Sequence, residues 1–296
     1  MNLVAKSHLG NYLEIVTAPP QLLVEDLGRR GYSWMGVTPS GACDQASFRL
    51  ANRLAGNPHH IPALEILYGP CQIVFHCSAI IAVTGAIQRL TIADRPCSFN
   101  YPHLVRRGET VSLEPPQFGL RSYLAIKGGL YVEPYLGSSS SDTLSGLGPA
   151  PLSEGDRVAI QETDLAAEIP FELAATNEIS DHFELTGWWG PRSRQLTRRS
   201  ISKLADKELI ASKDASRIGI RLLGAELSPE PKLHVEPEGI LRGFIQAPPS
   251  GELVLFLADH PTTGGYPVVG ALDPRSTDLA AQIRPGDSVS LKLSDS

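Results

Sequence analysis

The chain has 296 residues, of which 42% are hydrophobic and 20% charged, a composition typical of a globular protein with one large or two modest domains. Its net charge of −6 at pH 7 disfavours a nucleic-acid partner, because a phosphate backbone favours a basic surface. The longest apolar stretch, residues 79–87, is too short to span a bilayer, so we expect no membrane segment.

The N-terminal stretch MNLVAKSHLGNYLEIV has no uninterrupted apolar core and no cleavage site. We therefore expect no signal peptide and a cytoplasmic location. The four cysteines form no CxxC pair, which predicts reduced thiols and no zinc or other metal site. The sequence also lacks the GxxxxGK[ST], HExxH and GxSxG motifs, each of which marks a different catalytic class.

Short strands dominate the predicted elements. They are rich in apolar or β-branched residues and are mostly bounded by turn residues. In chain order, the clearest are residues 72–76, 79–85, 122–128, 252–259 and 288–294. The 27 glycines and 24 prolines are spread along the chain, which indicates many turns between short elements.

Helices are few. Residues 44–58 are predicted helical, because Asp44 can cap the N-terminus and the Gly56–Pro58 segment ends the helix. Helices are also predicted over 198–212 and 276–283. Residues 161–180 lack strand alternation, and we interpret them as the connection between two β-rich halves, 1–165 and 166–296.

One local pattern recurs three times, as GETVSL (108–113), GDRVAI (155–160) and GDSVSL (286–291). In each copy the glycine can adopt a positive φ, the acid can cap the turn, and alternation typical of a half-buried strand follows. The unequal spacing argues against a solenoid. The three copies predict similar turns that lead into strands of barrel-like sheets.

A series of motifs runs through the chain in a fixed order. They include VEDLGRRGYSWMGVTPSGACDQASFRLANRLAGNP (24–58), SYLAIKGG (122–129), SRIGIRLLG (216–224), GFIQAPPSGE (243–252) and ADHPTTGGYP (258–267). On these motifs the chain resembles the KipA family, which includes the C subunit of 5-oxoprolinase and the carboxyltransferase half-domain of urea amidolyases. The resemblance extends over residues 13–291.

Three positions depart from the family's pattern. Ser139 stands where an arginine is expected, Ile87 where a polar residue is usual, and Glu25 where a glutamine is usual. Each departure alters a polar group at a possible ligand wall. An altered substrate and drift at a structural position both remain open as explanations.

The resemblance implies a mainly β fold with a few short helices, arranged as two β-barrel-like subdomains with a cyclophilin-like element. It also implies a hydrolase role within an ATP-dependent 5-oxoprolinase complex, which converts 5-oxo-L-proline to L-glutamate. The implied partners are a KipI-like protein (the B subunit of 5-oxoprolinase) and the A subunit of the same enzyme. ATP would act through the complex, bound by this chain or by a partner.

Two alternatives remain open. The chain could be a carboxyltransferase half that acts on urea-like amides, or a KipA-like regulator that antagonises a KipI-type inhibitor of a histidine kinase. The only methionines are Met1 and Met35, so this chain has no Met-Lys-Met biotin site, and a separate chain would have to carry the biotin.

Three side chains are candidate catalytic groups. Asp26 lies three residues before Arg29, and the two could bind substrate as a charge-assisted pair or form a structural salt bridge. Glu65 lies in the apolar run ALEIL, where burial would raise its pKa unless it is paired with an arginine such as Arg29. Gln246 precedes two prolines, and its amide can match the donor and acceptor of a lactam.

Further residues are candidate substrate ligands beside Arg29. Ser40 could donate a hydrogen bond to a ligand, and Asp44 could do more than cap its helix. Lys127, at the end of a predicted strand, could neutralise a phosphate or be simply solvated.

The stretch Thr262, Thr263, Gly264, Gly265 and Tyr266 combines small hydroxyls with bare backbone. A β-bulge alone needs only one glycine, so a pair of glycines favours the interpretation that backbone N–H groups here face a ligand. Tyr266 would then close the ligand pocket. The alternative is a tight hairpin with Tyr266 packed in the core.

Overall fold

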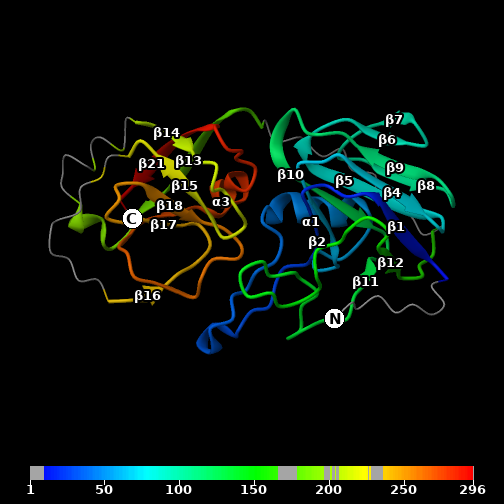
Figure 1. The fold of residues 1–296 in the computed structure, drawn as a ribbon, viewed down its shortest axis with the longest axis horizontal. Coiled ribbons are helices and arrows are strands. Elements are labelled where there is room, and N and C mark those ends of the chain that lie inside the picture. Colours follow the sequence, from blue (N-terminus) through cyan, green and yellow to red (C-terminus); the bar gives the residue numbers. More distant parts are fainter. Residues whose placement is uncertain are drawn as a thin grey trace. The chain divides into compact units, whose positions relative to one another are not determined.

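The computed structural model describes residues 10–165, 179–196, 201, 204, 207–225, 227 and 236–295. The chain forms two compact units (Figure 1). The N-terminal unit comprises residues 1–29, 44–142 and 146–179, and the barrel unit comprises 30–43, 143–145 and 180–296. The predicted boundary at 165/166 adjoins residues 166–178, which lie outside the described residues.

The N-terminal unit is built almost entirely from strands. Its elements are β1 (Tyr12–Thr17), β2 (Gln21–Glu25), α1 (Gln45–Leu54), β3 (Ala63–Leu67), β4 (Cys71–Phe75), β5 (Ala79–Ile87), β6 (Leu90–Ile92), β7 (Arg95–Cys97), β8 (Pro102–Val105), β9 (Thr110–Leu113), β10 (Phe118–Ile126), β11 (Leu130–Tyr131) and β12 (Arg157–Ile160). They form a seven-stranded sheet in the order β11-β12-β1-β4-β9-β6-β7 and a five-stranded sheet in the order β2-β3-β10-β5-β8.

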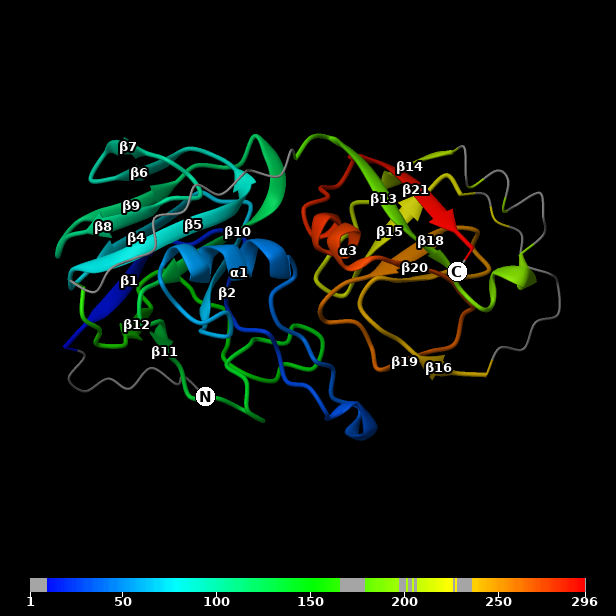
Figure 2. The same cartoon turned by 180° about the vertical axis from the view of Figure 1, so that it is seen from behind.

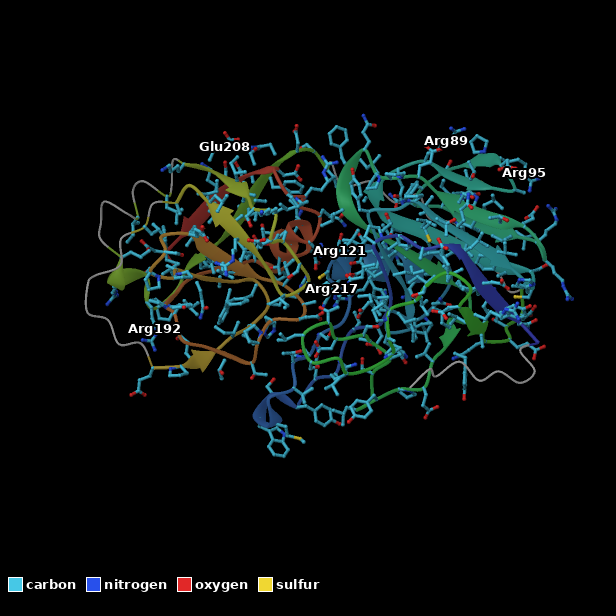
Figure 3. All side chains as sticks on the ribbon, viewed as in Figure 1. Arg89, Arg95, Arg121, Arg192, Glu208 and Arg217 are labelled. Carbon is cyan, nitrogen blue, oxygen red and sulfur yellow. The ribbon has the colours of Figure 1, made fainter. Side chains whose placement is uncertain are left out.

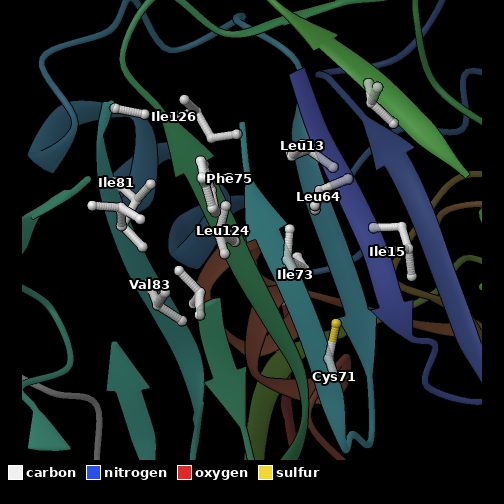
Figure 4. Close-up of a cluster of buried hydrophobic side chains, with 14 of the residues drawn as sticks. Leu13, Ile15, Leu64, Cys71, Ile73, Phe75, Ile81, Val83, Leu124 and Ile126 are labelled. Carbon is white, nitrogen blue, oxygen red and sulfur yellow. The ribbon is translucent and has the colours of Figure 1, made fainter. Parts of the chain in front are cut away.

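The two sheets of this unit share one hydrophobic core. Alternate residues of β1 and β4, such as Leu13 and Ile73, meet alternate residues of β5 and β10, such as Ile81 and Leu124 (Figure 4). These four side chains are completely buried. Each contributes about 1.5–3 kcal/mol relative to an exposed position. Burial alternates along β4, which fixes its core face, whereas β5 is buried along almost its whole length.

Helix α1 lies against β5 and β10, as the view from behind shows (Figure 2). The predicted cap is confirmed, because the side chain of Asp44 accepts a hydrogen bond from the backbone N–H of Ser47 over 2.9 Å. A further bond runs from the hydroxyl of Thr84 on β5 to the carbonyl of Ser47 over 2.7 Å. The N-terminus of α1 is therefore fixed both by its own cap and by the sheet.

The barrel unit contains a closed seven-stranded barrel. Its elements are η1 (Ser33–Met35), β13 (His182–Trp189), η2 (Ser193–Gln195), β14 (Glu208–Ala211), β15 (Gly219–Leu223), β16 (Glu238–Gly239), β17 (Phe244–Gln246), β18 (Leu253–Phe256), β19 (Thr263–Gly264), β20 (Val268–Leu272), α3 (Pro274–Ala280) and β21 (Ser288–Ser294). The barrel order is β13-β20-β17-β18-β15-β14-β21, with β13 and β21 parallel, and β16 pairs with β19 separately. Closure leaves the barrel strands without an unpaired edge.

The expectation of a mainly β protein with few helices is confirmed. Two helix predictions need correction. In the helix predicted over 198–212, residues 201 and 204 are helical, but residues 208–211 form strand β14. Residues 198–200, 202–203 and 205–206 lie outside the described residues. The helix predicted over 276–283 begins earlier, at Pro274, because Asp273 caps it by accepting a hydrogen bond from the backbone N–H of Ser276.

The recurring turn pattern forms the same structure three times. The carboxylates of Glu109, Asp156 and Asp287 each accept a hydrogen bond from the backbone N–H three residues earlier, over 2.8, 2.8 and 2.7 Å. The glycine before each acid has a φ of 87°, 83° or 92°, and its own N–H donates to a neighbouring strand. The predicted positive φ of the glycine and the predicted capping by the acid are therefore confirmed in the turns that precede β9, β12 and β21.

All four cysteines are reduced thiols rather than disulfides. No helix in the described part of the chain reaches the length and apolarity that a bilayer-spanning helix requires.

Candidate functional site

The barrel places Gln246 directly beside the Thr–Thr–Gly–Gly loop. Gln246 ends β17 and pairs with Val268 of β20, next to a shift in register. Its Nε2 donates to the carbonyl of Tyr266 over 2.9 Å. A Cβ added to Gly264 would lie 2.4 Å from the same Nε2, so a side chain at Gly264 would displace the Gln246 amide.

Several of the predicted ligand-binding groups of the loop lie on the surface. Thr263 and Gly265 are exposed, and Tyr266 is 47% exposed, so this tyrosine is not packed in the core. β19 pairs with β16, a strand remote in sequence, with Gly264 opposite Glu238, rather than forming a tight hairpin. Neither glycine has a left-handed φ, and nothing lies within 4 Å of a Cβ added to Gly265.

Thr262 contributes to the loop through its backbone. Its carbonyl accepts a hydrogen bond from the N–H of Ile240, one residue beyond β16, over 3.0 Å. This bond and the β16–β19 pairing fix the loop on one side, while the Gln246 amide fixes it at Tyr266 on the other. The exposed groups between these two anchors are therefore held in place by the barrel.

A buried ion pair lies immediately before this loop. The Nε and Nη2 atoms of Arg217 lie 2.9 and 3.0 Å from the two carboxylate oxygens of Asp259. Both side chains are almost completely buried. The same carboxylate accepts hydrogen bonds from the hydroxyl of Ser40 (2.5 Å) and from the N–H and hydroxyl of Thr143 (2.9 and 2.6 Å).

This cluster joins distant parts of the sequence within the barrel unit. Arg217 also donates to the carbonyl of Gly41, so residues 40–41 and 143 are both fastened to the barrel. Burial by itself raises the pKa of Asp259, but the Arg217 guanidinium and the Ser40 and Thr143 hydroxyls together lower that pKa below its ordinary value. Ser40, predicted as a substrate ligand, therefore donates its hydroxyl hydrogen to Asp259.

In the N-terminal unit, Asp26 is the centre of a serine-rich turn. Its carboxylate accepts from the N–H of Gly28, the hydroxyls of Ser138 and Ser140, and the N–H of Ser139, all over 2.6–2.7 Å. Three of these bonds converge on Oδ1 and the fourth is accepted by Oδ2, so the carboxylate is held through both oxygens. Asp26 therefore fastens residues 138–140 to the turn that contains Gly28.

Arg29 is brought to the same turn without an ion pair to Asp26 among the described residues. Its Nη2 donates to the carbonyl of Ser140, and the side chain is 1% exposed. Its Nε and Nη1 have no hydrogen-bond partner within the described part of the chain. Ser139, where the family pattern has arginine, donates its hydroxyl to the carbonyl of Val132 over 3.2 Å.

Glu65 and Asp44 are joined through one tyrosine. The hydroxyl of Tyr123 donates to Oε2 of Glu65 over 2.8 Å and accepts from the backbone N–H of Asp44 over 2.7 Å. The Nε of Arg121 lies 3.5 Å from the other oxygen of Glu65 (Figure 3 labels Arg121). An arginine therefore does pair with the buried Glu65, but it is Arg121 and not Arg29.

Lys127 is 7% exposed, so the interpretation as a solvated lysine is wrong. Its backbone N–H donates to the carbonyl of Ile80 over 2.8 Å, which places it at the end of the β10–β5 pairing.

Several groups around these candidates were missed from the sequence. They are Arg217 and Asp259 in the barrel unit and Arg121, Tyr123, Ser138 and Ser140 in the N-terminal unit. Arg217 and Asp259 both lie inside motifs that carry the family resemblance, SRIGIRLLG and ADHPTTGGYP. An arginine and an aspartate in two otherwise apolar strand ends were a signal of a buried pair.

Two cavities lie away from these residues. One, of about 580 Å³, is lined by Gly10, Asn11, Tyr131, Ala159, Ile160, Gln161 and Glu162 in the N-terminal unit. The other, of about 230 Å³, is lined by Trp189, Leu204 and residues 291–294 in the barrel unit. Within the described residues, no group of three or more His, Cys, Asp or Glu side chains could hold a metal ion. Thr263, Gly265 and Tyr266 of the loop are exposed at the surface.

Comparison with known proteins places this fold among carboxyltransferase domains. Residues 35–293 match the family model described as carboxyltransferase domain, subdomain A and B. The chain is 30% identical to the C subunit of 5-oxoprolinase from Escherichia coli, over 94% of this chain and 89% of that protein. It is 31% identical to urea amidolyase of Lachancea kluyveri, over 93% of this chain but only 16% of that protein.

Solved structures show the same fold inside longer chains. TTHA0988 matches with a TM-score of 0.88 at 30% identity, over 99% of this chain and 57% of that chain. The urea amidolyase of K. lactis matches with a TM-score of 0.85 at 27% identity, over 96% of this chain and 19% of that chain. The same fold therefore makes up most of the E. coli protein, whereas in TTHA0988 and the K. lactis urea amidolyase it is one part of a longer chain.

Proposed function

We propose that the chain, which belongs to the family of carboxyltransferase domains with subdomains A and B, is the C subunit of a 5-oxoprolinase. This enzyme is a multi-subunit hydrolase that opens 5-oxo-L-proline to L-glutamate with ATP hydrolysis. The observation that carries the proposal is the extent of the match to the C subunit of the E. coli 5-oxoprolinase, which covers 89% of that protein. The match to urea amidolyase accounts for only 16% of the relative.

The proposed activity needs partner chains, namely a KipI-like protein (the B subunit of 5-oxoprolinase) and the A subunit of the enzyme. The exposure of Thr263, Gly265 and Tyr266 supports this requirement, because a reaction that must exclude water needs its open side covered. The relatives in which this module is part of a longer chain support it as well.

The chemistry explains what the loop would contribute. An unstrained lactam resists water, and phosphorylation of its oxygen converts it into an activated imidate that water can attack. The Gln246 amide uses Nε2 to bind the Tyr266 carbonyl, and its Oε1 has no hydrogen bond within the described residues. That oxygen is a suitable acceptor for a lactam N–H, and the Thr263 hydroxyl and the Gly265 N–H are suitable donors to lactam oxygens.

Two of the other candidate residues, Asp26 and Glu65, lie in the N-terminal unit and are bound by other residues of that unit. Asp26 accepts four hydrogen bonds, and Glu65 is held by the Tyr123 hydroxyl and lies 3.5 Å from Arg121. We assign them structural roles and place substrate recognition at Gln246 and residues 262–266.

The test is to purify the chain alone and together with the A and B subunits, and to measure glutamate formed from 5-oxoproline with and without ATP. We expect no turnover by the single chain and ATP-dependent turnover by the complex. Cross-linking with 8-azido-ATP would identify which of the three chains binds the nucleotide. Turnover by the single chain, or none by the assembled complex, would contradict the proposal.

Two substitutions connect the activity to the loop. Gln246→Ala and Thr263→Val should abolish the activity of the complex while both proteins keep the wild-type circular dichroism spectrum. Thr91→Val, on strand β6 of the N-terminal unit, is the matched control and should leave the activity unchanged. Wild-type rates in the two loop variants would remove these residues from the site.

A second candidate function is a carboxyltransferase half that acts on urea-like amides with a separate biotin carrier. The family model and the 31% identity to urea amidolyase favour it. Avidin distinguishes the two functions, since it should block a reaction that passes through biotin and leave lactam hydrolysis unaffected.

A further inference from the structure

Arg192 carries a partly exposed guanidinium next to the loop. It follows β13 in the basic stretch RSRQLTRRS, and Figure 3 shows it beside the strand labelled β16 in Figure 1. Its Nε lies 3.0 Å from Oε1 of Glu238, and the two side chains are 29% and 23% exposed. Arg192 is therefore neither buried nor freely extended into solvent.

Glu238 connects Arg192 to the site proposed above. The same Oε1 accepts a hydrogen bond from the N–H of Val268 over 3.2 Å. Val268 is the register partner of Gln246, and Glu238 is the register partner of Gly264. Glu238 thus connects Arg192 to β20 through its carboxylate and to β19 through its backbone pairing.

The remaining donors of Arg192 are suited to a second carboxylate. A guanidinium has five N–H donors in a planar fork, and the contact to Glu238 is made by Nε. Within the described part of the chain, its two outer nitrogens make no hydrogen bond or ion pair. Two parallel outer N–H groups bind a carboxylate in the bidentate geometry that is strongest for such pairs.

We propose that Arg192 binds the carboxylate of the substrate and makes the site selective for small lactams or amides that carry an acid group. This inference rests on the proposed function. 5-Oxoproline carries a carboxylate next to its lactam, whereas urea carries none. Gln246 would hydrogen-bond the amide and Arg192 would bind the carboxylate. Arg192 would therefore have a ligand group in 5-oxoproline but none in urea.

The experiment compares the wild-type complex with Arg192→Gln and Arg192→Lys. Arg192→Gln should raise the KM for 5-oxoproline about tenfold to a hundredfold, the loss typical of a hydrogen bond to a charged group. The kcat should change little, and the inhibition constant of the neutral lactam 2-pyrrolidinone should stay the same. Arg192→Lys keeps the charge but not the fork, and should show a smaller rise in KM.

Arg221→Gln is the matched control. Arg221, on barrel strand β15, forms a similar surface ion pair over 3.4 Å with Glu252, the residue just before β18. This variant should leave the KM for 5-oxoproline unchanged. An equal loss of 5-oxoproline and 2-pyrrolidinone binding in Arg192→Gln, or no change in either, would overturn the inference.

Calorimetric titration of 5-oxoproline into the complex without ATP separates this inference from the proposed function. If the wild type binds 5-oxoproline but does not hydrolyse it, and Arg192→Gln binds it more weakly, the proposed function fails and the carboxylate site stands. If Arg192→Gln hydrolyses and binds it as the wild type does, the proposed function stands and the carboxylate site fails. If the wild type neither binds nor hydrolyses it, both fail.

Discussion

At the scale of single residues, buried charge decides which side chains are anchors. Asp259 is buried within the barrel unit, where Arg217, Ser40 and Thr143 surround its carboxylate with donors and lower its pKa. A buried pair of this kind is costly to break, since removal of one partner leaves the other charge unmatched. Asp259 therefore has the contacts expected of a structural group, although it lies next to the candidate loop.

We expect Asp259→Asn to lower the free energy of unfolding by about 3–5 kcal/mol, measured by urea denaturation at pH 7. Because the folded-state pKa of Asp259 is lowered, its contribution is fully present above the unfolded value, about 4, and is lost as the pH falls through the folded value. The free energy of unfolding of Asp259→Asn should therefore fall less than that of the wild type as the pH is lowered. Glu252→Gln, at a surface pair, is the control, and an equal cost in both variants would contradict the expectation.

The two loop glycines should respond differently to alanine. Gly264→Ala places a Cβ 2.4 Å from Nε2 of Gln246, so we expect lower stability and lower activity of the complex. Gly265→Ala meets nothing within 4 Å and needs no left-handed φ, so its melting temperature should match the wild type. If a ligand lies against this backbone, Gly265→Ala should still raise the KM severalfold. A wild-type KM for Gly265→Ala would show that nothing binds there.

At the scale of elements, the turn that occurs three times gives a test of local sequence control. A Cβ at Gly108, Gly155 or Gly286 would meet nothing within 4 Å, so the cost of alanine there arises from the positive φ alone. We expect Gly→Ala to cost about 1–2 kcal/mol at each site and Gly→Asn to cost less, by urea denaturation. Widely different costs at the three sites would show that the surroundings, and not the turn, dominate.

Elements of this kind could be predicted because their causes are local. Alternation predicts β4 and β21, and a short continuous apolar run predicts β5. Asp44 caps α1 and the Gly–acid pair forms each turn, all within a few residues of sequence. β14 was mistaken for a helix because its four residues, ELIA, have good helix propensity and become a strand only by pairing with β15 and β21.

The contacts that define the candidate site could not be predicted in the same way. The Asp26 carboxylate is satisfied by serines more than 100 residues away, and Asp259 by a serine 219 residues away. A single sequence gives no distance for such pairs. The family resemblance marked Asp26, Ser40 and Gln246 as important, but only the fold distinguishes anchors such as Asp26 from exposed groups such as Thr263.

At the scale of the whole molecule, the barrel unit is discontinuous in sequence. Residues 30–43 and 143–145 belong to it, although they come from the N-terminal half of the chain. Both segments are fastened to the barrel by the Arg217–Asp259 pair, through Ser40, Gly41 and Thr143. The barrel therefore completes its buried polar cluster with residues that the strands themselves do not provide.

We therefore expect a fragment of residues 166–296 to be much less stable than the same barrel in the full chain. Without residues 30–43 and 143–145, the buried pair of Asp259 and Arg217 loses at least three hydrogen bonds, each worth about 1.5–3 kcal/mol at a charged group. Urea denaturation followed by tryptophan fluorescence measures the difference, and co-expression with residues 1–165 should restore the stability. An isolated fragment that unfolded cooperatively at the same urea midpoint as the full chain would contradict this expectation. In that case Asp259→Asn should lower the free energy of unfolding by the same amount in the fragment as in the intact protein.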